Sequence, residues 1–200
     1  MNRSSSLRAV STGESSNDLT FRDLVFSDFA RFQPGAKTSW LGVLVRLPSV
    51  PGLVASIVLR AQQCLFRAGK VRLAAALRTP GNTLVGADFG PGMQIGTGLM
   101  MAHPVGVTIG YGLRIGDNVT FAGGVTAAAR HYDGAAGLEQ EFATICDGAV
   151  LGAHSVLVGG VRIGVNAMVG ANSVVLSDVP DNAVVMGSPA RQVGVREVPA

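Results

Sequence analysis

A repeat of six residues is the feature of this sequence that most restricts its fold. Apolar residues stand six positions apart in three runs, and the residue after each is often glycine or alanine. The runs are Phe89, Ile95 and Met101; Ile109, Ile115, Phe121 and Ala127; and Leu151, Leu157, Ile163, Val169 and Val175. A helix with 3.6 residues per turn would spread such a pattern around its whole surface. A period of six therefore excludes one amphipathic helix over this region.

A six-residue unit suits a short flat strand followed by a tight turn, and three units close a triangular coil of about 18 residues. The apolar residue points inward, and the small residue after it lets the backbone turn. Stacked coils then bury a continuous apolar column. An ordinary β-rich domain with scattered glycines is the alternative, but three separate runs at one spacing argue against it. We predict a mainly β fold, a parallel β-helix over residues 84–188, with a loop excursion at 128–150 where the repeat is interrupted.

The part of the chain before the repeat has a helical pattern. From 21 to 83, apolar residues recur at intervals of three and four, broken by prolines and glycines, which predicts a short α-helical region. The clearest helix covers about 53–67, and a second short one should end at Thr79-Pro80-Gly81. Residues 1–20 are rich in Ser and Asn and predict a disordered tail without a secretory signal, and 189–200 should form a C-terminal tail.

Charge is divided unevenly between these two parts. Residues 1–83 carry 11 basic and 4 acidic side chains, whereas 84–200 carry 5 and 9. A basic front could indicate nucleic acid, but no aromatic residues alternate with the basic ones, so we predict a solvated helical face and no nucleic-acid partner. Arginines interrupt the apolar stretch 53–77, so membrane contact should be peripheral at most.

The cysteines and histidines do not suggest a disulfide scaffold or a metal site. The chain has two cysteines, Cys64 and Cys146, which is too few for a disulfide scaffold and fits a cytoplasmic protein. No cluster of Cys, His and carboxylate residues has the spacing of metal ligands, so no metal is expected.

A longer pattern within the repeat is more specific. It comprises Gly-Ala-Asp-Phe-Gly-Pro-Gly at 86–92, Ile-Gly-Thr-Gly-Leu at 95–99, His-Pro-Val-Gly-Val-Thr-Ile-Gly at 103–110 and Gly-Ser-Pro-Ala-Arg at 187–191. This pattern resembles the serine acetyltransferase-like family of hexapeptide-repeat acyltransferases, which includes O-acetyltransferases of the colanic-acid and exopolysaccharide type. The resemblance implies a left-handed β-helix, a homotrimer, acetyl-CoA as co-substrate and no metal. It also implies that a chain ending in Val-Pro-Ala lacks the isoleucine tail that docks on a sulfhydrylase partner.

The resemblance assigns catalytic roles to His103 and Asp88, which are fifteen residues apart, close to one coil. In the family a histidine acts as general base on the acceptor hydroxyl, and an aspartate orients its ring. This is chemically reasonable, since a neutral imidazole can accept a proton near neutral pH and a carboxylate on its other nitrogen fixes the tautomer. The alternative is that His103 is only a corner residue and Asp88 only a turn former.

The resemblance also implies positions for both substrates. Ala129, Ala153 and Ala171 would line the groove for acetyl-CoA, although alanine is also what the turns of a repeat tolerate, and Arg191 would contact a phosphate.

The acceptor side departs from the family. Ala102 replaces the aspartate that precedes the catalytic histidine, and Glu141-Phe142 falls where the family has an Arg-His pair. His131 could reach the acceptor from the loop, whereas His154 is expected to be an outward-facing surface group.

We therefore predict an acetyl-CoA-dependent O-acetyltransferase whose acceptor hydroxyl belongs to a sugar, such as an exopolysaccharide precursor, or to L-serine. The alternatives are a catalytically silent trimeric scaffold or binding module, and an N-acetyltransferase acting on an amino sugar.

Overall fold

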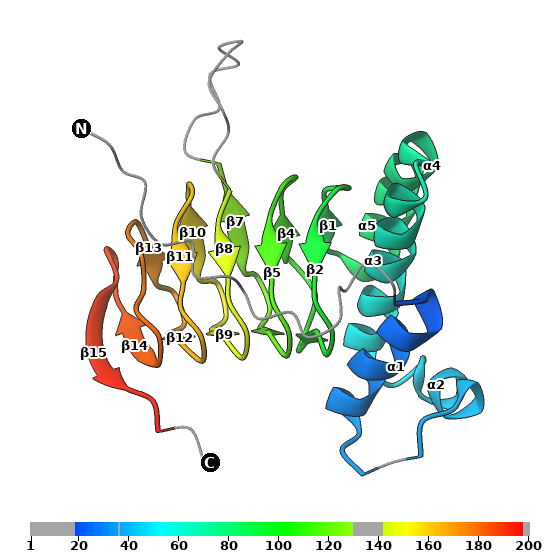
Figure 1. Ribbon diagram of the computed structural model, residues 1–200, viewed down its shortest axis with the longest axis horizontal. Helices are drawn as coiled ribbons and strands as arrows, with labels where there is room; N and C mark the ends of the chain where they lie inside the picture. Colours follow the sequence, from blue (N-terminus) through cyan, green and yellow to red (C-terminus); the bar gives the residue numbers. More distant parts are fainter. Residues whose placement is uncertain (1–18, 36, 130–141, 198–200) are drawn as a thin grey trace.

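The structure is a computed structural model that describes residues 19–35, 37–129 and 142–197. Helices occupy the first part of the chain and short strands the second (Figure 1). The helices are α1 (Phe21–Phe32), α2 (Trp40–Arg46), α3 (Pro51–Arg67), α4 (Val71–Ala76) and α5 (Arg78–Val85). The helical region predicted over 21–83 is therefore present, and the helix expected near 53–67 is α3.

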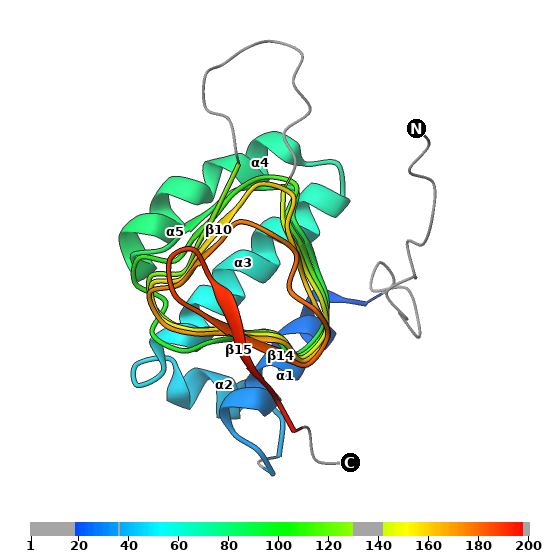
Figure 2. The same cartoon turned by 90° about the vertical axis from the view of Figure 1, so that its left-hand side faces the viewer.

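The strands form three sheets that wrap around a common axis. They are β1 (Asp88–Phe89), β2 (Gln94–Ile95), β3 (Met100–Met101), β4 (Thr108–Ile109), β5 (Arg114–Ile115), β6 (Thr120–Phe121), β7 (Thr126–Ala128), β8 (Thr144–Ile145), β9 (Val150–Leu151), β10 (Val156–Val158), β11 (Arg162–Ile163), β12 (Met168–Val169), β13 (Val174–Val175), β14 (Ala183–Met186) and β15 (Arg191–Val195). The sheet orders are β1-β4-β7-β10-β13, β2-β5-β8-β11 and β3-β6-β9-β12-β14-β15, and all pairs are parallel except β14 with β15. Seen along the axis, the coils are triangular (Figure 2). The predicted left-handed parallel β-helix is confirmed.

The six-residue repeat forms the core of the coils. Every apolar residue on which the prediction was based points inward and is at most 4% exposed. Small residues follow them because the backbones of neighbouring coils approach closely there. A Cβ added at Gly96, for example, would lie 2.7 Å from the carbonyl carbon of Gly116 in the next coil.

Two insertions interrupt the regular spacing of the strands. Successive strands begin six residues apart from β1 to β3, but eight residues separate the start of β3 from that of β4. The second and longer insertion lies between β7 and β8. The excursion expected over 128–150 is shorter than predicted, because Ala128 ends β7 and both β8 and the start of β9 lie inside that range.

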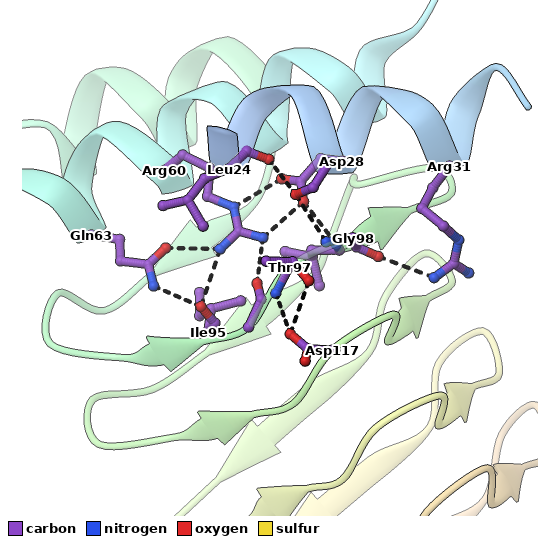
Figure 3. A network of polar contacts seen from close by, with 12 residues as sticks. Leu24, Asp28, Arg31, Arg60, Gln63, Ile95, Thr97, Gly98 and Asp117 are labelled. Atoms are coloured by element: carbon purple, nitrogen blue, oxygen red, sulfur yellow. Dashed lines mark hydrogen bonds and ion pairs between the residues drawn. The ribbon is translucent and has the colours of Figure 1, made fainter. Parts of the chain in front are cut away.

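A buried polar network joins the helices to the open end of the β-helix (Figure 3). Arg60 on α3 donates from Nε and a terminal nitrogen to the carboxylate of Asp28 on α1, at 2.9 and 2.8 Å, and both side chains are fully buried. Arg60 also donates to the carbonyls of Ile95 and Gly96, while Asp28 accepts the N–H of Leu99 at 2.8 Å. The first coil has no preceding coil to pair with, so the helices satisfy these backbone groups instead.

Two boundaries differ from the sequence prediction. Thr79, Pro80 and Gly81 do not stop the helical region but lie in the first turn of α5. Proline is tolerated there because the first N–H groups of a helix have no partner within the helix. The C-terminal segment expected to be a tail contains β15, which pairs with β14.

The surface of the helical region is partly apolar. Helix α2 exposes Trp40, Leu41, Leu44 and Val45, with exposed fractions between 42% and 72%. Among the described residues, no helix combines the length and the apolar character needed to cross a bilayer.

Candidate active site

His103 lies on the shorter of the two insertions, at one corner of the β-helix. This corner, called the His103 corner below, consists of residues 102–107, 122–125, 152–155 and 170–173, which connect β3 to β4, β6 to β7, β9 to β10 and β12 to β13. The His103 backbone has φ of 58°, in the left-handed region. Its side chain is exposed, so the two extra residues between β3 and β4 present an imidazole to solvent at the edge of the first coil.

Asp88 lies on β1, next to the segment that carries His103. The N–H of Gly106 donates to the carbonyl of Gly86 at 2.7 Å, and the N–H of Asp88 donates to the carbonyl of Val107 at 2.8 Å. The two predicted catalytic residues therefore belong to segments that are hydrogen bonded to each other.

The carboxylate of Asp88 pairs with Arg78, at the start of α5. Nε and a terminal nitrogen of Arg78 donate to the two carboxylate oxygens, both at 2.6 Å. These hydrogen bonds lower the pKa of Asp88 and raise that of Arg78, so the carboxylate stays ionised at neutral pH. Within the described residues, no hydrogen bond joins Asp88 to His103. The catalytic pair stays a prediction, and sequence analysis missed Arg78 as the partner of Asp88.

Three of the other predicted site residues also lie at the His103 corner. Ala102 directly precedes His103, and its N–H donates to the carbonyl of Phe121 at 2.8 Å. Ala153 and Ala171 occupy equivalent positions in successive coils, where the N–H of Asn172 donates to the carbonyl of Ala153 at 2.8 Å. A groove for acetyl-CoA that passes these alanines would run along the corner toward His103.

The remaining predicted site residues lie elsewhere. Ala129 follows β7 and Phe142 precedes β8, so both belong to the next corner of the triangle. The Phe142 ring packs over Gly110 and Gly112 and against the core, which gives it a structural role in this chain. Arg191 begins β15, at the end of the β-helix far from the helices (Figure 1). His131 lies outside the described residues.

His154 was expected to be only an outward-facing surface group. It is exposed, as expected, but it lies at the His103 corner, where its N–H donates to the carbonyl of Gly123 at 2.8 Å. The repeat itself could have shown this, because His154 stands three residues after Leu151, where most other turns have glycine or asparagine.

The described residues contain no group of three or more His, Cys, Asp and Glu side chains that could hold a metal ion. Cys64 and Cys146 are free thiols, and burial raises the pKa of each. The described part of the His103 corner presents an exposed imidazole and backbone groups, with the ionised carboxylate of Asp88 on the neighbouring strand.

Comparisons with known proteins show which proteins the chain is similar to in sequence and fold. No family model matches the chain. Serine acetyltransferase 4 from Arabidopsis thaliana is 38% identical over 72% of the chain and 39% of its own length. Serine acetyltransferase from Helicobacter pylori is 32% identical over 80% of the chain and 89% of its own length. The chain thus spans about two fifths of the plant relative and most of the bacterial one.

Solved structures of serine acetyltransferases share the fold. The soybean enzyme complexed with serine is 33% identical, with a TM-score of 0.75 over 89% of this chain and 71% of that one. A serine acetyltransferase in complex with CoA is 27% identical, with a TM-score of 0.72 over 86% and 68%. From this agreement in sequence and fold, the chain belongs to the serine acetyltransferase-like family of hexapeptide-repeat proteins.

Proposed function

We propose that the protein is an acetyl-CoA-dependent O-acetyltransferase in which His103 is the general base. The observation that carries this proposal is the exposed imidazole of His103, on a two-residue insertion of the first coil, in a chain of this family. If this turn only connected two strands, it would not need the two extra residues between β3 and β4, because the strands before and after each other turn at this corner begin six residues apart.

The reaction would be a direct transfer. His103 takes the proton of the acceptor hydroxyl, and the oxygen attacks the carbonyl carbon of the thioester. The new C–O bond forms as the C–S bond breaks, and the departing CoA sulfur receives the proton from the imidazolium. Asp88 would stabilise that imidazolium by a hydrogen bond or by the attraction of its negative charge. Ala153 and Ala171 would let the pantetheine arm approach the backbone, and Arg191 would contact a phosphate.

The acceptor is either L-serine or a sugar hydroxyl. The names of the relatives, and the serine bound to the soybean enzyme, favour L-serine. Ala102 and Phe142 favour another acceptor, because neither can bind the ammonium or carboxylate group of an amino acid through a charge.

The test is the release of CoA thiol from acetyl-CoA, with L-serine and a panel of sugars and nucleotide sugars supplied in parallel. We expect one acceptor class to accelerate release. We also expect His103→Ala to abolish turnover while acetyl-CoA still binds by calorimetry. Full activity of His103→Ala would refute the assignment of the base. Absence of acetyl-CoA binding to the wild-type protein would instead support the scaffold alternative, and mass spectrometry of the product would distinguish O- from N-acetylation.

We further propose a cytoplasmic homotrimer, with membrane contact at most peripheral. The apolar face of α2 is the place where such contact would occur, and flotation with lipid vesicles would detect it. Sedimentation equilibrium would measure the oligomeric state.

A further inference from the structure

One turn conformation recurs along the β-helix, and His154 adopts it where the other residues that adopt it are glycine or asparagine. In most turns of the described coils, the residue three positions after the inward apolar residue has a positive φ. These residues are Gly92, Gly98, Gly112, Asn118, Gly124, Gly148, His154, Asn166, Asn172 and Asn182. Glycine adopts this conformation freely and asparagine readily, whereas histidine adopts it less often than glycine does. His154, with φ of 57°, is the exception.

The second histidine with a positive φ is His103 itself. Apart from these two, every residue with a positive φ in the described part of the chain is glycine or asparagine. A side chain held in a disfavoured backbone conformation suggests a function, because glycine or asparagine would form the same turn at a lower conformational cost.

Both histidines pack against one dipeptide, Gly123-Gly124. A Cβ added at Gly123 would lie 2.8 Å from the carbonyl oxygen of His103 and 3.5 Å from its Cβ. A Cβ added at Gly124 would overlap the His154 ring, with Nδ1 as the nearest atom. The two glycines thus leave room for a histidine on either side.

The His154 ring is therefore directed back along the axis, toward the coil that carries His103. Adjacent Cα atoms are about 3.8 Å apart, so the carbonyl and Cβ of His103 and the ring of His154 lie against neighbouring residues of one coil. His154 is exposed, and among the described residues its ring makes no hydrogen bond or ion pair. Nδ1 is the ring nitrogen packed on Gly124, and Nε2 is not among the ring atoms nearest to that glycine.

We propose that His154 is a second imidazole of the acceptor site, which hydrogen bonds to a polar group of the acceptor next to the hydroxyl that reacts at His103. This inference rests on the proposed function. It requires an acceptor with at least two polar groups within a few ångströms of each other, as in an amino acid or a sugar with neighbouring hydroxyls. His154 is a positioning residue for the acceptor, and its neighbours Ala153 and Ala171 would contact the acetyl donor.

The test compares two substitutions with a matched control. His154→Asn and His154→Gly both remove the imidazole and suit a positive φ, so both should fold. Asn166→Gly changes a turn residue of the same conformation at a different corner. We expect the KM for the acceptor to rise about tenfold in both His154 variants, the effect of losing roughly one hydrogen bond. The KM for acetyl-CoA should stay within about twofold, and His154→Gly should melt at the same temperature as the wild type or higher.

An unchanged KM for the acceptor in both His154 variants would overturn the proposal, as would a rise in the KM for acetyl-CoA alone. The same rise in acceptor KM in Asn166→Gly would attribute the effect to the turns in general and also overturn it.

A second measurement does not depend on turnover. The ring C–H signals of His154 can be assigned in NMR spectra by their loss in His154→Gly, and the acceptor should shift them. If the wild-type protein transfers no acetyl group, the proposed function fails. The NMR shift of His154 with L-serine or a sugar then tests separately whether His154 binds such a molecule. Absence of any shift would overturn the binding role.

Discussion

Replacement of Asp28 by alanine should destabilise the protein strongly, because it leaves the buried charge of Arg60 without a counter-ion. Both side chains are fully buried, and the carboxylate accepts two hydrogen bonds from Arg60 and one from the N–H of Leu99. After the substitution, Arg60 retains neutral partners: Gln63 and two backbone carbonyls of the first coil. Removing one partner of a buried ion pair costs about 3–5 kcal/mol, a large part of the stability of a typical domain.

The assay is urea unfolding monitored by circular dichroism, with all variants at one protein concentration. The control is Arg162→Gln, which breaks an ion pair of nearly equal length, 2.9 Å to Asp181 instead of 2.8 Å. The Arg162 and Asp181 side chains are 45% and 52% exposed, so solvent screening should limit the cost to about 1 kcal/mol or less. An equal effect of Asp28→Ala and Arg162→Gln would refute the reasoning.

A double variant identifies the physical cause. If the stranded charge is responsible, adding Arg60→Met to Asp28→Ala should recover part of the lost stability, because no unpaired buried charge then remains. Recovery should be incomplete, because the N–H of Leu99 and the carbonyl of Gly96 still lose partners. A double variant less stable than Asp28→Ala alone would show that the bonds of Arg60 to the first coil, not its charge, dominate.

Three further predictions concern the His103 corner and its surroundings. Arg78→Gln should reduce stability by about 1 kcal/mol or less at pH 7, because the Arg78–Asp88 pair is partly exposed. Arg78 lowers the pKa of Asp88 in the folded state, so the ion pair stabilises the protein above the unfolded pKa of about 4, and this stabilisation is lost as pH falls through the lower folded pKa. The unfolding curves of the wild type and Arg78→Gln should therefore converge on acidification. A stability difference that grows at low pH would contradict the role of the Arg78–Asp88 pair. Asp88→Asn should lower kcat less than His103→Ala does, because it removes a charge and leaves the base in place. Steady-state kinetics measures both, and equal losses of kcat would contradict a supporting role for Asp88 and a base role for His103. Gly124→Ala should lower the melting temperature, because φ is +71° there and the added Cβ overlaps the ring of His154; an unchanged melting temperature would show that the ring moves freely.

The architecture of the β-helix was predictable because the same residue types recur at the same position in each six-residue unit. Each inward apolar residue, such as Ile115 or Leu157, performs the same task in its own coil, so the period reveals the fold without knowledge of long-range contacts. His103 was predictable from its motif, and the lengthened spacing between Met101 and Ile109 marks its insertion.

The helical region was less predictable because its contacts are specific pairs rather than a repeat. Asp28 and Arg60 are 32 residues apart, and nothing in the spacing shows that they meet under the first coil. The same is true of Arg78 and Asp88, where a short turn of the chain after α5 brings a guanidinium to the carboxylate. The second short helix predicted from the sequence is α4, but Pro80 does not end it, because α4 ends at Ala76 and Pro80 lies in the first turn of α5, where proline is tolerated.

The sequence by itself determined the coil, its inward column and the position of one candidate base, because these follow from a period and a motif. Only the tertiary structure decided which residues share a corner. His103 and His154 are 51 residues apart in sequence, and stacked coils of unequal length bring them to the same dipeptide. Coil stacking keeps this corner in register despite the two-residue insertion that carries His103, so residues from distant turns lie close together.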